Sequence, residues 1–217
     1  MTHIYAGRVQ DTRRPARADL GPGPLGRVDA SCYDPASLRR NIAVVFQDFY
    51  RYQLPAALNI GVGLPDAAGD RARMAGAVTA ADADRIIGAL PEGYDTYLSR
   101  EFAGGRDLSG GEWQRIALAR AFFRDAPMVV LDEPSAALDP RAEQELFERL
   151  RDLLAGRSVL LISHRFSTVR SADRIVVLDK GRVVEQGSHD ELMTLGGRYA
   201  EMFRLQADAY QTDPAPR

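Results

Sequence analysis

Two adjacent carboxylates, Asp132 and Glu133, follow the apolar run MVVL and precede Pro134. Ligand sites of open α/β sheets lie at the carboxyl ends of strands. Because neighbouring residues of a strand point to opposite sides, the two carboxylates can divide the work. One can hold Mg²⁺ while the other aligns or deprotonates an attacking water. The four residues VLDE are equally compatible with a solvated turn after a strand, since short motifs often occur by chance.

A second candidate is the run Ser109-Gly110-Gly111-Glu112, which opens a predicted helix. Amide groups at the start of a helix carry about half a positive charge, and glycines allow an anion to approach the backbone closely. The run therefore predicts a phosphate site. Taken alone, it is also an ordinary capping box whose glycines relieve crowding, because Ser109 and Glu112 have the S-x-x-E spacing.

Apolar periodicity and capping signals predict the elements that position these residues. Strands alternate with helices, which is typical of the α/β class. The expected elements are a helix start near Asp34, strand 41–46 ending at Gln47, helices 79–90 and 109–124, strand 128–131, helix 140–154 capped by Asp139, strand 158–162, a hairpin of 175–178 and 183–185 around Lys180-Gly181, and helices from Ser188 and near 199–209.

Length and composition narrow the class of protein. A chain of 217 residues predicts a single α/β-sized unit. A net charge of −2 gives no cationic excess for nucleic acid, which we do not expect as a partner. The only cysteine, Cys32, cannot form an internal disulfide, and the first residues lack the apolar stretch of a secretory signal, so we expect a cytoplasmic setting. No apolar run approaches the roughly 18 residues that span a bilayer.

Four motifs occur in a fixed order, LSGGEWQRIALARA, MVVLDEP, SAALD and ISHR. Together they resemble the nucleotide-binding domain of ATP-binding cassette (ABC) transporters over residues 34–209. The resemblance implies a P-loop NTPase (RecA-like) core with a parallel sheet and an ABC-type helical subdomain at about 60–125, lacking the first strands and the phosphate loop of the family. Residues 1–33 show no helical or strand periodicity and are expected to be irregular and unmatched, and residues 210–217 to form a tail.

The resemblance also implies roles for individual residues. Asp132 is similar to the Mg²⁺-associated carboxylate of the Walker B strand, and Glu133 to its general base. Ser109, Gly110 and Gly111 resemble the signature motif that meets the γ-phosphate of ATP bound to the opposing subunit. The motif ends in Glu112 where Gln is usual, which the capping box tolerates.

Three further residues match family positions. Gln47, in VVFQDF, resembles the Q-loop glutamine, which touches Mg²⁺ and the attacking water and contacts the membrane subunit. His164 resembles the switch histidine that hydrogen-bonds the γ-phosphate, and Asp139 resembles the D-loop aspartate. In isolation Gln47 would be a polar residue at a strand end and His164 a satisfied polar residue, while Asp139 can also cap the following helix.

The resemblance favours the exporter branch, on FQDFYRYQLPAALNI and HRFSTVRSADRIVVLDKGRVVEQGSHDEL. It implies ATP and Mg²⁺ as ligands and a second ABC nucleotide-binding domain as partner, in a homo- or heterodimer. It also implies a transmembrane transporter domain bound through the Gln47 region, which would place the chain at the inner face of the cell membrane.

One family motif is missing, the phosphate loop G-x-x-x-x-G-K-[S/T] (Walker A). The nearest string, GPGPLGRV at residues 21–28, lacks the Lys and the hydroxyl residue and holds two prolines that remove backbone donors. Losing three charge-assisted hydrogen bonds of about 1.5–3 kcal/mol each removes roughly 5–9 kcal/mol of phosphate binding. We therefore expect an N-terminally incomplete ATPase subunit that binds ATP weakly by itself. Alternatively, it is a non-catalytic subunit that only donates its signature motif to a partner's ATP site.

Overall fold

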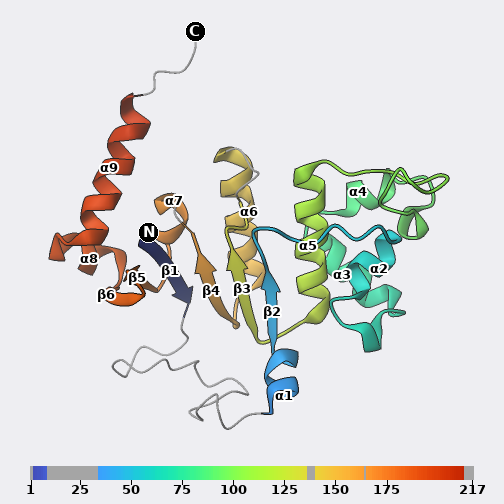
Figure 1. Ribbon diagram of the computed structural model, residues 1–217, viewed down its shortest axis with the longest axis horizontal. Coiled ribbons are helices and arrows are strands. Elements are labelled where there is room, and N and C mark those ends of the chain that lie inside the picture. The colour runs from blue at the N-terminus through green and yellow to red at the C-terminus, as the bar shows by residue number, and fades with distance from the viewer. Residues whose placement is uncertain (1, 9–33, 136–139, 164, 213–217) are drawn as a thin grey trace. The chain divides into compact units, whose positions relative to one another are not determined.

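The computed structural model describes residues 2–8, 34–135, 140–163 and 165–212. The chain divides into two compact units instead of the single unit that its length predicts. Residues 28–155 form the first, here called the helical unit. Residues 1–27 and 156–217 form the second, here called the sheet unit (Figure 1).

Two parallel strands form the sheet of the helical unit. Ile42 of β2 lies opposite Met128 of β3, and the register continues to Val45 opposite Leu131. This pair confirms the predicted parallel arrangement. The elements of the unit are α1 (Pro35–Arg40), β2 (Ile42–Val45), α2 (Ala56–Gly61), a 3-10 turn (Pro65–Ala67), α3 (Arg71–Ala80), α4 (Asp84–Gly88), a 3-10 turn (Gly93–Asp95), α5 (Gly110–Arg124), β3 (Met128–Asp132) and α6 (Pro140–Leu153).

Helix α5 organises the helical unit. It runs over the predicted residues, and its apolar side chains Trp113, Ile116, Leu118 and Phe123 are buried. It packs against α2, α3 and β2 (Figure 1). Between β2 and β3 the chain forms only helices and turns, apart from one isolated bridge of Pro55 with Tyr97. The domain limits at 34 and 209 stay predictions.

The helix predicted for residues 79–90 is wrong in its limits. Thr79 lies in the last turn of α3 and not at an N-cap, and its hydroxyl donates to the Asp84 carboxylate at 2.8 Å. The helical conformation is interrupted at Asp82, whose φ of 55° is left-handed. Aspartate tolerates this conformation better than most residues. Arg115 of α5 and Arg149 of α6 both pair with the Asp82 carboxylate, so contacts distant in sequence fix the break.

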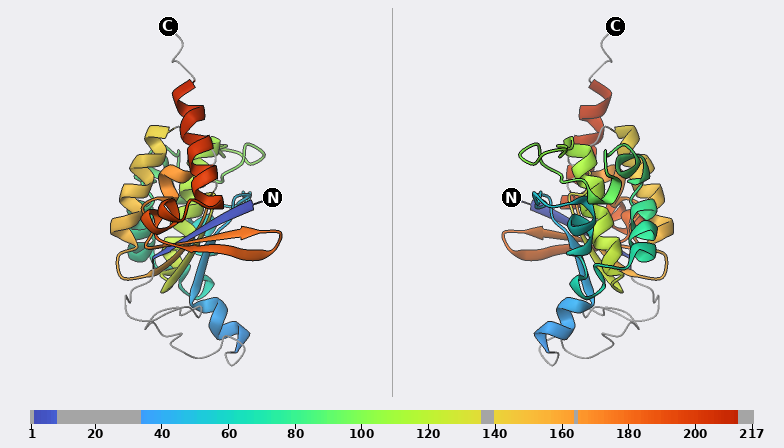
Figure 2. Two further views of the ribbon diagram at one scale, coloured as in Figure 1. Left: turned by 90° about the vertical axis from the view of Figure 1, so that its left-hand side faces the viewer. Right: turned by 90° about the vertical axis from the view of Figure 1, so that its right-hand side faces the viewer.

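The sheet unit contains a strand that the sequence did not predict. Residues 2–8, expected to be irregular, form β1 (Thr2–Arg8), which pairs antiparallel with β4 (Ser158–Ile162) and with β5 (Arg174–Asp179). Strand β6 (Arg182–Gly187) completes the hairpin with β5 (Figure 2). This hairpin confirms the prediction: Lys180 and Gly181 at its turn have φ of 50° and 75°, as two-residue hairpin loops require.

Three helices accompany this sheet: α7 (Phe166–Val169), α8 (His189–Leu195) and α9 (Arg198–Thr212). The predicted capping box at the start of α8 is present, because Ser188 accepts from the Glu191 amide and the Glu191 carboxylate accepts from the Ser188 amide. Tyr199 of α9 is fully buried. Its ring packs edge-on against that of Phe166 at a centroid distance of 5.3 Å.

Within the described ranges, no helix has both the length and the apolar content that crossing a membrane requires.

Candidate functional site

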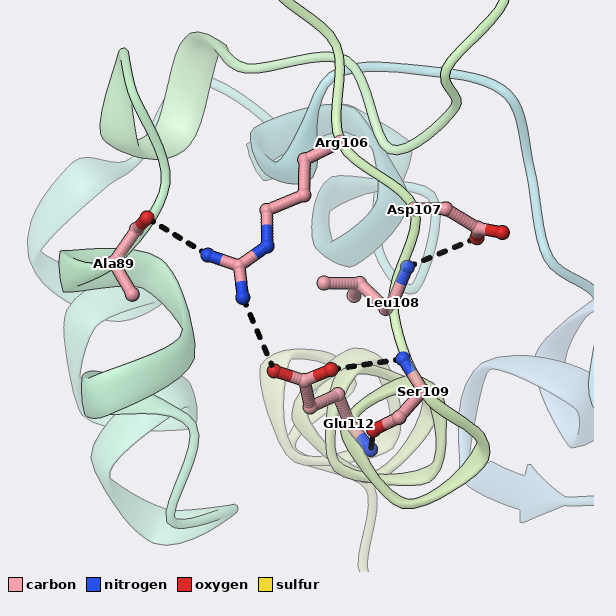
Figure 3. Close-up of polar contacts among 6 residues, drawn as sticks. All are labelled: Ala89, Arg106, Asp107, Leu108, Ser109 and Glu112. Atoms are coloured by element: carbon pink, nitrogen blue, oxygen red, sulfur yellow. Dashed lines mark hydrogen bonds and ion pairs between the residues drawn. The ribbon is translucent and has the colours of Figure 1, made fainter.

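The first turn of α5 is closed by a reciprocal pair of hydrogen bonds (Figure 3). The Ser109 backbone N–H donates to Glu112 Oε2 at 2.8 Å, and the Glu112 N–H donates to Ser109 Oγ at 3.3 Å. This is the capping box that the S-x-x-E spacing predicted. The Glu112 side chain is therefore folded back along the helix start, where it makes a structural contact.

Arg106 adds a cation to this carboxylate (Figure 3). Its Nη1 donates to the carbonyl of Ala89 at 2.9 Å, and its Nη2 lies 3.9 Å from Glu112 Oε1. The hydrogen bond from the Ser109 amide holds the pKa of Glu112 below its ordinary value, and the charge of Arg106 acts in the same direction. The negative charge of Glu112 is thus offset locally, which lessens the repulsion that an anion would meet at this turn.

The glycines of the turn leave the backbone open. A Cβ built at Gly110 or at Gly111 would meet no heavy atom within 4 Å, and Ser109 and Gly110 are exposed. Apart from the two donors used in the capping box, amides of this turn can face an incoming ligand. Helix α5 has 15 residues, and its open, glycine-containing first turn is chemically suited to bind an anion such as phosphate.

The acidic pair stands where β3 ends. Asp132 is the last residue of the strand and is half-buried, as is Glu133. Glu133 has a φ of 44°, in the left-handed region that side chains with a Cβ disfavour. Strained backbone of this kind clusters at functional sites. Ser135, two residues further on, is buried and donates to Glu143 Oε1 of α6 at 2.6 Å, which anchors the chain after the acidic pair.

Gln47 lies at the same sheet edge. It follows β2 by two residues and is exposed. Because β2 and β3 are parallel and Val45 lies opposite Leu131, the two strands end at neighbouring points, with Gln47 just after β2 and Asp132 as the last residue of β3. Figure 1 shows the start of α5 at this same end of the helical unit.

The donor set at this edge suits magnesium. Asp132 offers a carboxylate and Gln47 an amide oxygen, and Mg²⁺ is usually bound by one or two carboxylates together with phosphate oxygens and waters. Among the described residues, no group of three or more His, Cys, Asp or Glu side chains is arranged to hold a metal ion.

Two predicted site residues, Asp139 and His164, lie outside the described residues. The structure brings Gln47 to the same edge as Asp132 and Glu133, and it places Ser109, Gly110 and Gly111 on the open first turn of α5. Arg106 and the Ser135–Glu143 pair were missed. No local spacing marks them, because Arg106 precedes its helix and Ser135 and Glu143 belong to different elements.

Comparisons with known proteins agree with this geometry. A family model described as ABC transporter matches residues 18–136, more than half of the chain. The match begins within the segment 1–33 that was expected to be unmatched. The chain is 43% identical over 179 residues to a protein of Burkholderia orbicola (strain AU 1054) named ATP-dependent lipid A-core flippase, covering 82% of this chain and 29% of that protein. A protein of Cupriavidus metallidurans with the same name is 45% identical over 172 residues, covering 79% of this chain and 28% of that protein.

A solved structure is also similar. A bacterial Atm1-family ABC exporter, determined with ATP bound, superposes with a TM-score of 0.70 at 38% sequence identity, covering 84% of this chain and 30% of that one. The chain therefore spans about three tenths of the length of these exporters and flippases. Its motifs, its α/β fold with a parallel strand pair and these matches agree: the chain belongs to the ABC transporter family.

Proposed function

We propose that this chain is the ATP-binding and ATP-hydrolysing part of an ABC exporter, which energises transport through partner membrane domains. The observation that supports this most directly is the parallel register of β2 and β3, which brings Gln47 to the same sheet edge as Asp132 and Glu133. The open first turn of α5 adds a second phosphate-binding element in the same unit.

Each residue has a distinct role in this proposal. Asp132 and Gln47 would hold Mg²⁺, which when bound offsets the negative charge of the phosphates. Glu133 would accept the proton of the attacking water, as a general base. Its left-handed backbone fixes the direction in which the carboxylate leaves the strand end.

The signature turn would act on a second nucleotide. Ser109, Gly110 and Gly111 would bind the γ-phosphate of ATP held by a second ABC nucleotide-binding domain, in a homo- or heterodimer. By family resemblance, His164 would hydrogen-bond a γ-phosphate and Asp139 would contribute at the subunit interface. The Gln47 region would contact the membrane domain, which places the chain at the inner face of the membrane.

The alternative of a subunit that only donates its signature motif is not favoured. The relatives that match four fifths of the chain are named as ATP-dependent proteins, and the similar exporter was solved with ATP. The acidic pair after β3 also has no role in a chain that merely donates its first α5 turn.

The test is a Glu133→Gln substitution in the assembled transporter that contains this chain. Because the amide cannot accept a proton, ATP turnover should fall by about 10²-fold or more, while ATP-dependent pairing of the subunits is retained. Glu148→Gln, the same chemical change on the exposed side of α6, serves as the control and leaves turnover intact. Unchanged turnover in Glu133→Gln would remove this residue from the role of base.

A further inference from the structure

The guanidinium of Arg120, in the middle of α5, holds two backbone carbonyls outside its own helix. Its Nε donates to the carbonyl of Asn59 in α2 at 2.8 Å, and its Nη2 donates to the carbonyl of Tyr50 at 3.2 Å. Asn59 lies in the last turn of α2, where carbonyls lack partners within the helix. Tyr50 lies three residues after Gln47. One side chain therefore joins α5 to α2 and to the segment that follows Gln47.

An aromatic ring fixes the same guanidinium from another side. The Arg120 guanidinium carbon lies 4.8 Å from the centroid of the Tyr52 ring, and Tyr52 stacks on Tyr50 with centroids 5.8 Å apart. Burial lowers the pKa of Arg120, although an arginine keeps its charge at any ordinary pH. The electron-rich face of the ring attracts a partly desolvated cation. The planar fork is thus locked in orientation.

Asn59 holds the same segment from α2. Its side chain is fully buried, and Nδ2 donates to the carbonyls of Tyr52 at 3.0 Å and Leu54 at 2.9 Å. Residues 46–54 belong to no helix or strand, so these side-chain donors replace the ladder that would otherwise fix the backbone. The position of the segment after Gln47 depends on Arg120 and Asn59.

The contact between α2 and α5 is close. A Cβ built at Gly63, just after α2, would lie 2.2 Å from the carbonyl oxygen of Arg120, so only glycine fits there. Arg124, one turn further along α5, donates to the carbonyl of Gly63 at 2.8 Å. The end of α2 is therefore capped by two arginines of one helix face, as expected where cations meet a helix C-terminus.

We propose that Arg120 is a positioning residue, which fixes the segment 47–55 to the helix whose first turn carries Ser109, Gly110 and Gly111. The inference rests on the proposed function, because Gln47 is the residue it places. Ten residues of α5, about 15 Å, separate Gly110 from Arg120. The same helix thereby carries the phosphate-facing turn at one end and, further along, the anchor of a segment whose Tyr50 side chain is 73% exposed.

The experiment uses the full chain labelled with 3-fluorotyrosine, without nucleotide. Arg120→Lys keeps the charge but loses the fork, so the ¹⁹F resonance of Tyr52, assigned with Tyr52→Phe, should shift and broaden. Chymotryptic cleavage after Tyr50 and Tyr52 should become at least about five-fold faster, since the loss of one charge-assisted hydrogen bond changes a local opening equilibrium by this factor or more. Arg115→Lys, also on α5 but paired with Asp82, should change neither signal.

A folded Arg120→Lys variant with an unchanged Tyr52 resonance and an unchanged cleavage rate overturns the proposal. If Arg120→Lys does not fold, Tyr52→Leu decides, because it removes the ring under the cation and leaves the arginine in place. Faster cleavage after Tyr50 in that variant supports the proposal, and wild-type cleavage contradicts it. No ATP enters these measurements, so their outcome is independent of whether the chain hydrolyses ATP.

Discussion

Val45 of β2 lies opposite Leu131 of β3 in a parallel register. The two strands therefore end side by side. Asp132 is the last residue of β3 and Glu133 follows it, while Gln47 lies two residues after the end of β2. Parallel strands of open α/β sheets present ligand-binding residues at this edge. The relationship turns two separate sequence motifs into one candidate site.

The left-handed backbone of Glu133 predicts that this residue lowers the stability of the folded chain. A residue with a Cβ loses about 1–2 kcal/mol of stability in this conformation. Glycine removes this strain, but it loses more conformational entropy on folding, which cancels roughly half of the gain. We expect Glu133→Gly to raise the free energy of unfolding by about 1 kcal/mol, measured by urea denaturation. Glu133→Gln keeps the strain and should stay near wild type. Equal stability of the two variants would show that no strain is stored there.

The capping box of α5 predicts a loss of stability in acid. The pKa of Glu112 is held below its ordinary value of 4.5 by the Ser109 amide. The stabilisation is therefore complete above that ordinary value and is lost as the pH falls through the lower folded-state pKa. Melting temperatures of wild type and Glu112→Gln should differ most near pH 7 and converge as the pH falls through the lowered folded-state pKa of Glu112. A difference that is independent of pH would mean that the charge of Glu112 contributes nothing.

The buried phenol of Tyr199 predicts a loss of stability at alkaline pH. Burial raises the pKa of its phenol to about 12, from an ordinary value of 10.0, and its hydroxyl lies 2.9 Å from His189 Nδ1. The folded state holds the proton more tightly, so stability is full below pH 10 and declines as the pH rises through 12. Tyr199→Phe should cost about 0.5–1.5 kcal/mol at pH 8 through the lost hydrogen bond. Between pH 8 and pH 11 it should lose less stability than wild type in urea titrations, and an equal loss would contradict the assignment.

The sequence also predicts weak ATP binding by the chain of 217 residues alone. It contains no G-x-x-x-x-G-K-[S/T] loop. Millimolar to micromolar binding of ATP corresponds to a binding free energy of roughly 4–8 kcal/mol, and the hydrogen bonds that such a loop supplies contribute a comparable amount. Isothermal titration of the purified chain with Mg-ATP should give a dissociation constant of about 1 mM or weaker. A micromolar constant would contradict this expectation.

Local signals in the sequence predicted local structure well. Both capping boxes, at Ser109 and at Ser188, are present, because each depends on two residues three positions apart. The hairpin turn at Lys180-Gly181 followed from its turn residues. These features are decided within a few residues of chain, so tertiary contacts had little scope to alter them.

Features that depend on distant partners were missed. Strand β1 forms because Tyr5 pairs with Ile162 on one side and with Val176 on the other. The residues of β1 do not by themselves indicate either partner. The break at Asp82 depends on arginines 33 residues or more further along the chain. Arg120 is part of the run LSGGEWQRIALARA, and only the fold shows that its side chain binds the segment after Gln47.

The most direct test of the central claim concerns the first turn of α5. ATP turnover is measured in the assembled transporter with wild-type chain, Ser109→Arg, and Ser188→Arg as a control at the other capping box. If the turn meets the phosphate of an ATP held by a second subunit, Ser109→Arg should lower turnover by at least about ten-fold, a barrier of roughly 1.4 kcal/mol, while Ser188→Arg leaves it near wild type. Wild-type turnover in Ser109→Arg would contradict the account.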